Sequence, residues 1–557
     1  MTMFDFFKNK RQLEQLNEEV CKNLTFQGSV PLDLVDNIKP KDISRDRIEI
    51  IRKLFSLAFC FIVIMLFYRV QIFTKDTKVL KNNENPFYRP DIVDRNGEVI
   101  TTNFPMMDLF VEPKNVVDAE RSAKALVKIL PKLDYEEVLT KMKSGKNFSY
   151  LKRQITPTEQ ERIWLIGEPG FGFKKNEGRV YPSGTLFAHV VGNVDIDNNG
   201  VSGIEKWIDE HKLNKSKESV ELSVDMYIQD AIRQNLIKAM DEYGAKSAGG
   251  IVMDVKTGEI LGLVSLPDFK NNDYKKTVFN SLYNNHVTLD VYEVGSVMKI
   301  FNTALAIENN YPNDKIFDVS KIFKIGNHRV KDSHPKKWLL NMTEGFIYSS
   351  NIVMANIAIE LGVEKQKEFF QKLNMLKKME FELPERGLTI YPKDWNETNG
   401  ASIGYGYSMS PTMLHVVAAV NAIVNDGMYV APTLIKRKKD SLLKSVQVVS
   451  PATSEAMRKL MRLVITDGTG YMAKMKDIRV GGKTGTSYKI INGAYDNSKT
   501  RTFFVSIFPA ESPKYTMLIM LDEANNKGCN SSACTAVPVS SNIIKEITSI
   551  LNLDLRL

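Results

Sequence analysis

One strongly apolar stretch near the N-terminus constrains what this chain can become more than any other feature. Residues 54–73 read LFSLAFCFIVIMLFYRVQIF, with no charge before Arg69. A helix needs about 20 such residues to cross a bilayer, and the long side chains of Arg69 and Gln71 can reach the interface. We therefore expect one transmembrane helix over residues 51–73, with a buried core helix as the alternative.

The residues around this stretch indicate its orientation. Arg52 and Lys53 directly precede it, as cations do on the cytoplasmic side of a span. No small-residue cleavage site follows it, and residues 1–50 come first, which argues against a removable signal peptide. We expect residues 1–50 to form a cytoplasmic tail and the chain beyond the anchor to lie on the outer side of the membrane.

Composition excludes several classes of protein. The 557 residues exceed one ordinary domain, so two or three folded units are expected. A hydrophobic content of 43% is that of a chain with a packed core. The net charge of +9 is spread along the chain. Because no compact basic patch is interleaved with aromatic residues, nucleic acid is not expected as a partner.

The four cysteines are Cys21, Cys60, Cys529 and Cys534. None forms a C-x-x-C pair and no histidine completes a zinc pattern, so no metal site is expected. Cys529 and Cys534 lie five positions apart. Outside the cytoplasm they would form either a local disulfide or two free thiols.

Beyond the anchor, the sequence pattern that predicts helices and strands changes near Glu221. Residues 74–220 combine short β-like runs, a turn at Asn96-Gly97 and amphipathic helical stretches such as AERSAKALVKIL. They contain no phosphate-binding loop and no catalytic cluster. We expect these residues to form a β-rich, elongated, non-catalytic pedestal domain.

Residues 221–557 have the pattern of an α/β domain with a helical insert. A helix is predicted after the capping residue Asp225. The run AGGIVMDVKTGEILGLVSLP predicts two antiparallel strands joined by a turn. Three later runs, VGGKTGTSY, TRTFFVSIFP and YTMLIMLDE, are further strand candidates.

The reactive centre is predicted in EVGSVMKIFNTALAIENN, where a serine precedes a lysine by one helical turn. Ser296 follows Gly295 at the start of an apolar helix, where free backbone N–H groups and the helix dipole favour an anion. Lys299 lies on the same side one turn later. Apolar neighbours would lower the pKa of its amine, so that neutral Lys299 can take the serine proton.

The S-x-x-K pattern is weak evidence by itself, because each of three related motifs occurs twice. The second copies are Ser441-Leu442-Leu443-Lys444, Ser540-Ser541-Asn542 and Lys256-Thr257-Gly258. They fall in a charged loop, after both K-T-G motifs, and in a hairpin turn. Only Ser296, Ser349-Ser350-Asn351 and Lys483-Thr484-Gly485 follow the order S-x-x-K, S-x-N, K-T-G with each motif on a suitable element.

With these motifs the chain resembles a class B penicillin-binding protein, one of the active-site serine penicillin-recognising enzymes. RPDIVDRNG at 89–97, RVYPSG at 179–184 and GIE at 203–205 are similar to landmarks of that family's pedestal domain. GYG at 404–406 resembles the segment between the second and third motifs. The resemblance implies a transpeptidase domain over 221–557, with an antiparallel sheet, helices on both faces and a helical subdomain.

The resemblance also implies a role for each residue of the first two motifs. Ser296 would attack the carbonyl of the penultimate D-alanine of a peptidoglycan stem peptide and release the terminal D-alanine. Lys299 would be the general base, Ser349 would relay the proton to the leaving amine, and Asn351 would hold the substrate amide and fix Lys299. An amine of a neighbouring strand would then attack the acyl-enzyme, with no metal and no organic cofactor.

The third motif is implied to bind the substrate. Lys483 would supply a positive field, Thr484 and Thr486 would bind the terminal carboxylate, and Gly485 lies between them. The N–H groups of Ser296 and Thr486 would form an oxyanion hole, a role worth about 3–4 kcal/mol per donor. One position departs from the family, because Val294 stands where proline usually precedes the G-S pair. This change removes no catalytic group.

Several other functions are compatible with the same chemistry. A β-lactamase or β-lactam receptor would share the motifs, but no convincing Glu-bearing deacylation loop lies between Ser349 and Lys483. The intact motifs argue against a catalytically retired division scaffold. Within class B, the runs YEVGSVMK, IYSSN and VGGKTGTSYK resemble the septal type more than the elongation type.

The septal type implies particular partners and a location. Its substrates would be stem peptides on lipid-II-derived glycan strands, and β-lactams would inhibit it. It would pair with a polytopic lipid-II polymerase and with divisome membrane proteins. It would lie in the bacterial cytoplasmic membrane with its catalytic domain in the periplasm.

Overall fold

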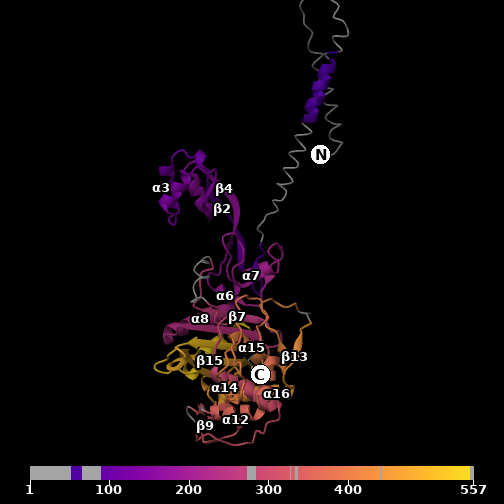
Figure 1. Ribbon diagram of the computed structural model, residues 1–557, viewed down its shortest axis with the longest axis vertical. Helices are drawn as coiled ribbons and strands as arrows, with labels where there is room; N and C mark the ends of the chain where they lie inside the picture. Colours follow the sequence, from indigo (N-terminus) through magenta and orange to yellow (C-terminus); the bar gives the residue numbers. More distant parts are fainter. Residues whose placement is uncertain are drawn as a thin grey trace, which may run out of the picture. The chain divides into compact units, whose positions relative to one another are not determined.

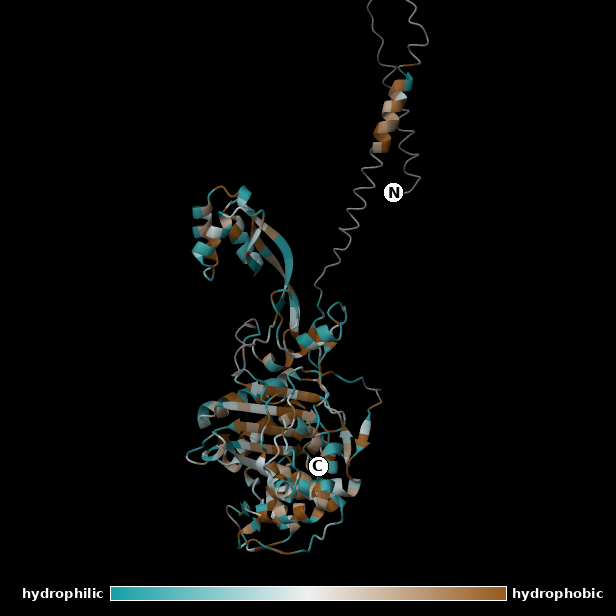
Figure 2. Cartoon of the chain, viewed as in Figure 1, coloured by the Kyte–Doolittle hydropathy of each residue, from teal (hydrophilic) through white to brown (hydrophobic). Residues whose placement is uncertain are grey.

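The computed structural model describes residues 50, 52–65, 89–271, 284–326, 328–332, 337–438 and 442–551. The chain divides into two units, Met1–Pro86 and Phe87–Leu557. In the first unit, residues 52–65 form a helix of mostly hydrophobic residues (brown in Figure 2). Among the helices of the described residues, none combines the length and the apolarity that a bilayer crossing requires. Residues 1–49 of the predicted tail, and residues 51 and 66–73 of the predicted anchor, lie outside the described residues.

The second unit begins with a sheet built around one long strand, β2 (Val99–Val111). Its order is β3-β2-β1-β5, with β4 also paired to β2, and Figure 1 shows β2 and β4 side by side. The β1–β5 pair is parallel and the other pairs are antiparallel. The remaining strands are β1 (Ile92–Val93), β3 (Ser149–Ile155), β4 (Phe171–Val180) and β5 (Val220–Glu221).

Helices with apolar faces pack on this sheet around a small core of their own. The amphipathic stretches predicted from the sequence are helical, and their starts are capped by the side chains of Asp118, Asp134 and Thr156, which satisfy free N–H groups. These helices are α3 (Ala119–Ile129), α4 (Tyr135–Met142) and α5 (Pro157–Trp164). The same region also contains η1 (Pro113–Asn115), α6 (Ala188–Val191) and α7 (Gly203–Glu210), and the apolar residues of α6 and α7 belong to a larger core.

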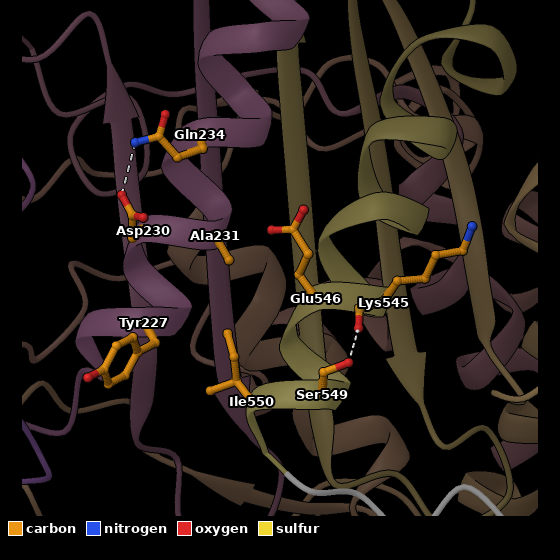
Figure 3. A pocket seen from close by; sticks show the side chains of 8 residues that line it. All are labelled: Tyr227, Asp230, Ala231, Gln234, Lys545, Glu546, Ser549 and Ile550. Atoms are coloured by element: carbon orange, nitrogen blue, oxygen red, sulfur yellow. Dashed lines mark hydrogen bonds between the residues drawn. The ribbon is translucent and has the colours of Figure 1, made fainter.

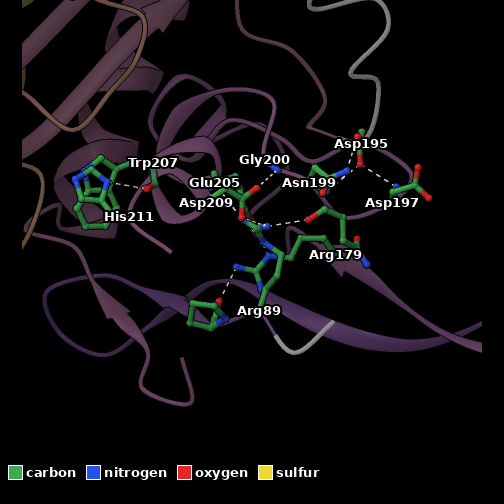
Figure 4. Close-up of polar contacts among 12 residues, drawn as sticks. Arg89, Arg179, Asp195, Asp197, Asn199, Gly200, Glu205, Trp207, Asp209 and His211 are labelled. Carbon is green, nitrogen blue, oxygen red and sulfur yellow. Dashed lines mark hydrogen bonds and ion pairs between the residues drawn. The ribbon is translucent and has the colours of Figure 1, made fainter. Parts of the chain in front are cut away.

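A buried charge cluster connects the start of this region with α7 (Figure 4). Glu205 is fully buried, and its carboxylate accepts from Arg89 Nε at 3.0 Å and from Arg179 Nε at 2.7 Å. Arg89 Nη1 also lies 2.7 Å from Asp209 Oδ1. Opposite charges buried together with good geometry compensate for much of their lost hydration. The RVYPSG and GIE runs of the sequence therefore meet in space, although they lie apart in the chain.

A five-stranded antiparallel sheet forms the centre of the remaining chain, in the order β14-β15-β16-β6-β7. All three late strand candidates and the early hairpin predicted from the sequence are strands of this sheet. Their bounds are β6 (Ser247–Asp254), β7 (Ile260–Leu266), β14 (Gly481–Ile491), β15 (Ala494–Phe508) and β16 (Tyr515–Asp522).

Both faces of this sheet are covered, as the alternation of side chains along a strand requires. In β16, Met517 and Ile519 belong to the core under α8 (Met226–Tyr243) and α17 (Ala536–Ile550). Leu518 belongs to the larger core on the opposite face. The predicted capping residue Asp225 accepts from the N–H groups at the start of α8.

The larger core contains the helical part of the domain. Its central helix, α15 (Met413–Val424), is buried along its whole length, and all of its residues except His415 and Asn421 are apolar, as is typical of a helix surrounded by core. The neighbouring helices are α10 (Lys299–Glu308), α11 (Met342–Ile347), α12 (Asn351–Leu361), α13 (Val363–Lys372), α14 (Glu397–Tyr405) and α16 (Pro451–Thr466). Short pairs of strands join them: β8 (Phe317–Asp318) with β11 (Leu339–Leu340), β9 (Phe323–Ile325) with β10 (His328–Val330), and β12 (Met428–Val430) with β13 (Ser445–Gln447).

Candidate active site

Ser296 lies in a tight turn that leads into a buried helix. The sequence predicted an α-helix start here, and the structure shows a 3-10 turn, η3 (Gly295–Met298), followed by α10. In a 3-10 turn, side chains three positions apart eclipse one another. Ser296 is half-buried, whereas Lys299 is fully buried. The predicted nucleophile and base therefore project from the same side of one short turn.

The ammonium group of Lys299 is held by the second motif. Its Nζ donates to the carbonyl oxygen of Ser349 at 2.6 Å, to Ser349 Oγ at 3.1 Å and to Asn351 Oδ1 at 2.7 Å. Burial lowers the pKa of Lys299 to about 7, while the nearby carboxylate of Asp332 acts in the opposite direction. An amine with this pKa is partly neutral near pH 7 and can accept a proton.

Ser349 occupies the centre of the site in an unusual backbone conformation. Its φ of +63° is in the left-handed region, which costs free energy for a residue with a Cβ and is found most often at functional sites. It directly precedes Ser350, whose side chain caps α12. This conformation directs both the carbonyl and the hydroxyl of Ser349 at Lys299.

Lys483 reaches the same hydroxyl from the sheet. Its Nζ donates to Ser349 Oγ at 2.9 Å and lies 5.7 Å from the ring centre of Phe346. Burial, together with the charge of Lys299, holds the pKa of Lys483 well below its usual range. Because two buried ammonium groups repel one another, the charged form of Lys483 is favoured when Lys299 is neutral or when a carboxylate arrives next to Lys483.

Glycines allow the strand β14 to approach the Ser296 turn. A Cβ at Gly295, whose φ is +56°, would lie 2.8 Å from the carbonyl carbon and 3.1 Å from the amide nitrogen of Thr486. A Cβ at Gly485 would lie 2.8 Å from a methyl group of Val297. These contacts are too close for any side chain. The backbone N–H of Thr486 is therefore brought next to that of Ser296.

The two threonines of the third motif make different contacts. The hydroxyl of Thr484 lies 2.7 Å from that of Thr469, and Thr486 Oγ1 accepts from the backbone N–H of Ser532 at 3.1 Å. Thr484 is buried and Thr486 is half-buried. All the residues predicted as catalytic or substrate-binding thus gather at the junction of η3, α12 and β14.

Asp332 is a further residue of this site that was not identified from the sequence. Its carboxylate accepts from the N–H groups of Asn351 and Ile352 at 2.6 and 3.1 Å, and from Ser350 Oγ at 2.6 Å. It therefore anchors the start of α12, where a negative charge is favourable. Nothing in the local sequence marks it, because it lies 19 residues before Asn351.

Comparison with known proteins identifies the family. Residues 248–545 match the family described as the penicillin-binding protein transpeptidase domain, and residues 84–228 match the penicillin-binding protein dimerisation domain. The chain is 32% identical over 481 residues to a probable peptidoglycan D,D-transpeptidase FtsI of Caulobacter vibrioides, with 83% of this chain and 81% of that protein covered. The chain is a class B penicillin-binding protein.

Other relatives share most of its length. It is 29% identical to stage V sporulation protein D of Bacillus subtilis, with 82% of this chain and 77% of that protein covered. Its fold is similar to a crystal structure of penicillin-binding protein 3 of Mycobacterium tuberculosis in complex with aztreonam. That similarity has a TM-score of 0.66 and 24% identity, and covers 84% of this chain and 97% of that one.

The duplicate motifs of this penicillin-binding protein lie elsewhere. Lys256 is exposed in the hairpin turn and pairs with Asp426, and Ser540 lies within α17, where its hydroxyl donates to the carbonyl of Ala536. Lys444 is exposed, and Ser441 lies outside the described residues. The described residues of the duplicate motifs, Lys256, Lys444 and Ser540, thus share none of the contacts that join Lys299, Ser349 and Lys483.

A surface groove of about 500 Å³ lies away from these motifs (Figure 3). It runs between α8 and α17, and its lining includes Tyr227 and Ile550. None of its lining residues belongs to the three motifs. In the described ranges, no cluster of three or more His, Cys, Asp or Glu side chains could hold a metal ion.

Proposed function

We propose that this penicillin-binding protein is a peptidoglycan D,D-transpeptidase of the septal type, anchored in the cytoplasmic membrane with its catalytic domain outside. The observation that carries the catalytic part is the hydroxyl of Ser349, which accepts from both Lys299 and Lys483 beside the Ser296 turn. This arrangement links a base and a cation through one proton-relaying group, next to the proposed nucleophile.

Acylation uses the depressed pKa of Lys299. The neutral amine takes the proton of Ser296 Oγ as that oxygen attacks the carbonyl of the penultimate D-alanine. When the tetrahedral intermediate collapses, the C–N bond breaks, and the terminal D-alanine leaves with a proton relayed through Ser349. Lys299 is neutral again at the end of this half-reaction.

Binding of the substrate uses the strand β14. The N–H groups of Ser296 and Thr486, brought together by Gly295, stabilise the oxyanion. The hydroxyls of Thr484 and Thr486 and the ammonium of Lys483 bind the terminal carboxylate. This negative charge also favours the charged form of Lys483, whose pKa is lowered by burial.

Deacylation completes the cross-link. An amine from a neighbouring stem peptide attacks the ester carbonyl, and the amide bond forms as the Ser296 oxygen leaves. The same lysine and serine take the amine proton and return a proton to Ser296. The proposed products are a cross-linked pair of strands and the free enzyme.

The septal role is supported by sequence similarity. The runs YEVGSVMK, IYSSN and VGGKTGTSYK resemble those of the septal type, and the Caulobacter relative carries the name FtsI. The proposed partners are a polytopic lipid-II polymerase and divisome membrane proteins. Depletion of the protein in its own cell should produce filaments, whereas rounded cells would support an elongation role instead.

A fluorescent penicillin tests the catalytic proposal. The full chain should be labelled covalently and should retain the label for many minutes. Ser296→Ala should abolish labelling, while Ser441→Ala, in the duplicate S-x-x-K motif, should leave it intact. Labelling that survives in Ser296→Ala would reject the proposed nucleophile, and loss of the label within seconds would favour a β-lactamase.

A further inference from the structure

A disulfide-closed loop lies directly beside the third motif. Cys529 and Cys534 are joined by a disulfide, which decides between the two alternatives that the sequence left open. Both cysteines are half-buried, in the segment between β16 and α17. Inside this loop, the backbone N–H of Ser532 donates to Oγ1 of Thr486 at 3.1 Å. The loop therefore contacts a residue that we assign to carboxylate binding.

Hydrogen bonds also fasten this loop to the sheet. Ser532 is 1% exposed, and its Oγ donates to the carbonyl of Phe503 at 2.6 Å. Thr500 Oγ1 donates to the carbonyl of Asn530 at 2.8 Å. Both Phe503 and Thr500 belong to β15, which pairs with β14 along the third motif. The position of the Ser532 N–H relative to Thr486 is thus set by the loop and by β15 together.

The bond from Ser532 determines what the Thr486 hydroxyl can do. A hydroxyl has one hydrogen to donate and two lone pairs to accept with. When one lone pair accepts from Ser532, the hydrogen must point away from that N–H. It is then available to an anion bound beside β14.

We propose that the Cys529–Cys534 disulfide and Ser532 are positioning elements for Thr486, so that the redox state of this cysteine pair tunes recognition of the substrate carboxylate. The disulfide limits the conformations that the six-residue segment 529–534 can adopt. Opening it frees the Ser532 N–H to move and the Thr486 hydroxyl to rotate. The inference rests on the proposed function, because it assigns Thr486 to the carboxylate of the same substrate.

The test compares oxidised and reduced forms of the full chain in detergent. Cys21→Ser and Cys60→Ser are introduced first, so that Cys529 and Cys534 are the remaining cysteines. Dithiothreitol passes two electrons to the disulfide, which yields two thiols and cyclic oxidised dithiothreitol. Acylation by a fluorescent penicillin is followed at several concentrations, to separate the apparent binding constant from the limiting rate.

Reduction should weaken apparent binding of the penicillin about fivefold, the effect of losing one net hydrogen bond. The limiting acylation rate should stay unchanged, because the carboxylate contact is made equally in the bound and the transition state. Cys529→Ser with Cys534→Ser should reproduce the reduced form and should not respond to dithiothreitol.

Thr486→Val supplies the decisive comparison, since it keeps the shape of the side chain but removes the hydroxyl. If the loop acts through that hydroxyl, reduction should have no further effect on binding in this variant. An equal loss in Thr486→Val, or equal binding by oxidised and reduced protein, would overturn the inference. An oxidised protein that takes no label would instead reject the proposed function and this inference with it.

Discussion

The backbone of Thr486 lies directly against Gly295, so close that a Cβ at position 295 would be 2.8 Å from the Thr486 carbonyl carbon. Gly295 also has a φ of +56°, which residues with a Cβ rarely adopt. These two requirements together place the third motif beside the nucleophile. They make Gly295 as necessary to the site as the polar residues around it.

Gly295→Ala should slow acylation by penicillin on the order of 100-fold, because a displacement of about 1 Å at a reacting group carries such a cost. The second-order rate of labelling measures it. Gly493→Ala is the matched control, since Gly493 has a φ of +81° but open space around its missing Cβ. Similar losses in both variants would show that backbone strain, and not the approach of Thr486, is responsible.

The pH dependence of acylation should report the amine of Lys299. Burial lowers its pKa to about 7, and the neutral form is the active base. The rate should therefore rise with pH, about tenfold between pH 6 and pH 8, and level off above. Stopped-flow labelling with penicillin, whose carboxylate stays ionised over this range, provides the measurement. A flat profile would exclude Lys299 as the titrating base.

Asp332→Asn should shift that profile to lower pH. The carboxylate of Asp332 raises the pKa of Lys299 against the larger effect of burial. An amide in its place keeps an oxygen for the N–H groups of α12 but removes the charge, so the pKa of Lys299 should fall further. The acylation rate at pH 6 should then be closer to the plateau that the rate reaches at high pH.

Asp318→Asn is the control for this charge effect. Asp318 is exposed and accepts from the N–H and hydroxyl of Ser320, two residues away. Its replacement should leave the pH profile in place. A profile that does not move in Asp332→Asn would mean that this carboxylate serves only to anchor α12.

Glu205→Gln should destabilise the protein by about 3–5 kcal/mol, because it removes the carboxylate that pairs with buried Arg179 and one of the two that pair with buried Arg89. Arg89 and Arg179 both bond to this carboxylate and are nearly inaccessible to solvent. Thermal unfolding of the full chain measures the loss.

Glu137→Gln breaks an exposed ion pair with Lys141 within α4 and should cost less than about 1 kcal/mol. A comparable loss of stability in Glu137→Gln and Glu205→Gln would contradict a structural role for the buried charge cluster. Penicillin labelling of the folded fraction of Glu205→Gln should be retained, since the cluster shares no residue with the three motifs.

The local sequence pattern predicted many of the helices and strands of this protein. The periodicity of apolar residues identified α8 and the strands β14, β15 and β16, and Asp225 marked the start of α8. Such features depend on residues close together in the chain, whose side-chain spacing follows directly from helix or strand geometry. The same local rules selected Ser296, Ser349 and Lys483 from duplicated motifs.

Contacts between residues far apart in the chain could not be predicted from the local sequence pattern. Asp332 has no local signature, and its importance arises from the folding of its loop onto the start of α12. The left-handed φ of Ser349 is likewise imposed by its surroundings, since serine has no preference for it. The choice between a disulfide and two thiols depended on the distance between two ends of a turn.

The sequence by itself thus predicted which residues form the candidate site and determined the order in which they occur, because the motifs and the helix and strand patterns depend on residues that are neighbours in the chain. The tertiary structure alone decided how these residues meet. One hydroxyl lies between Lys299 and Lys483, and two glycines let Thr486 reach the Ser296 turn. Such positions result from the packing of η3, α12 and β14 against one another, which no single segment encodes.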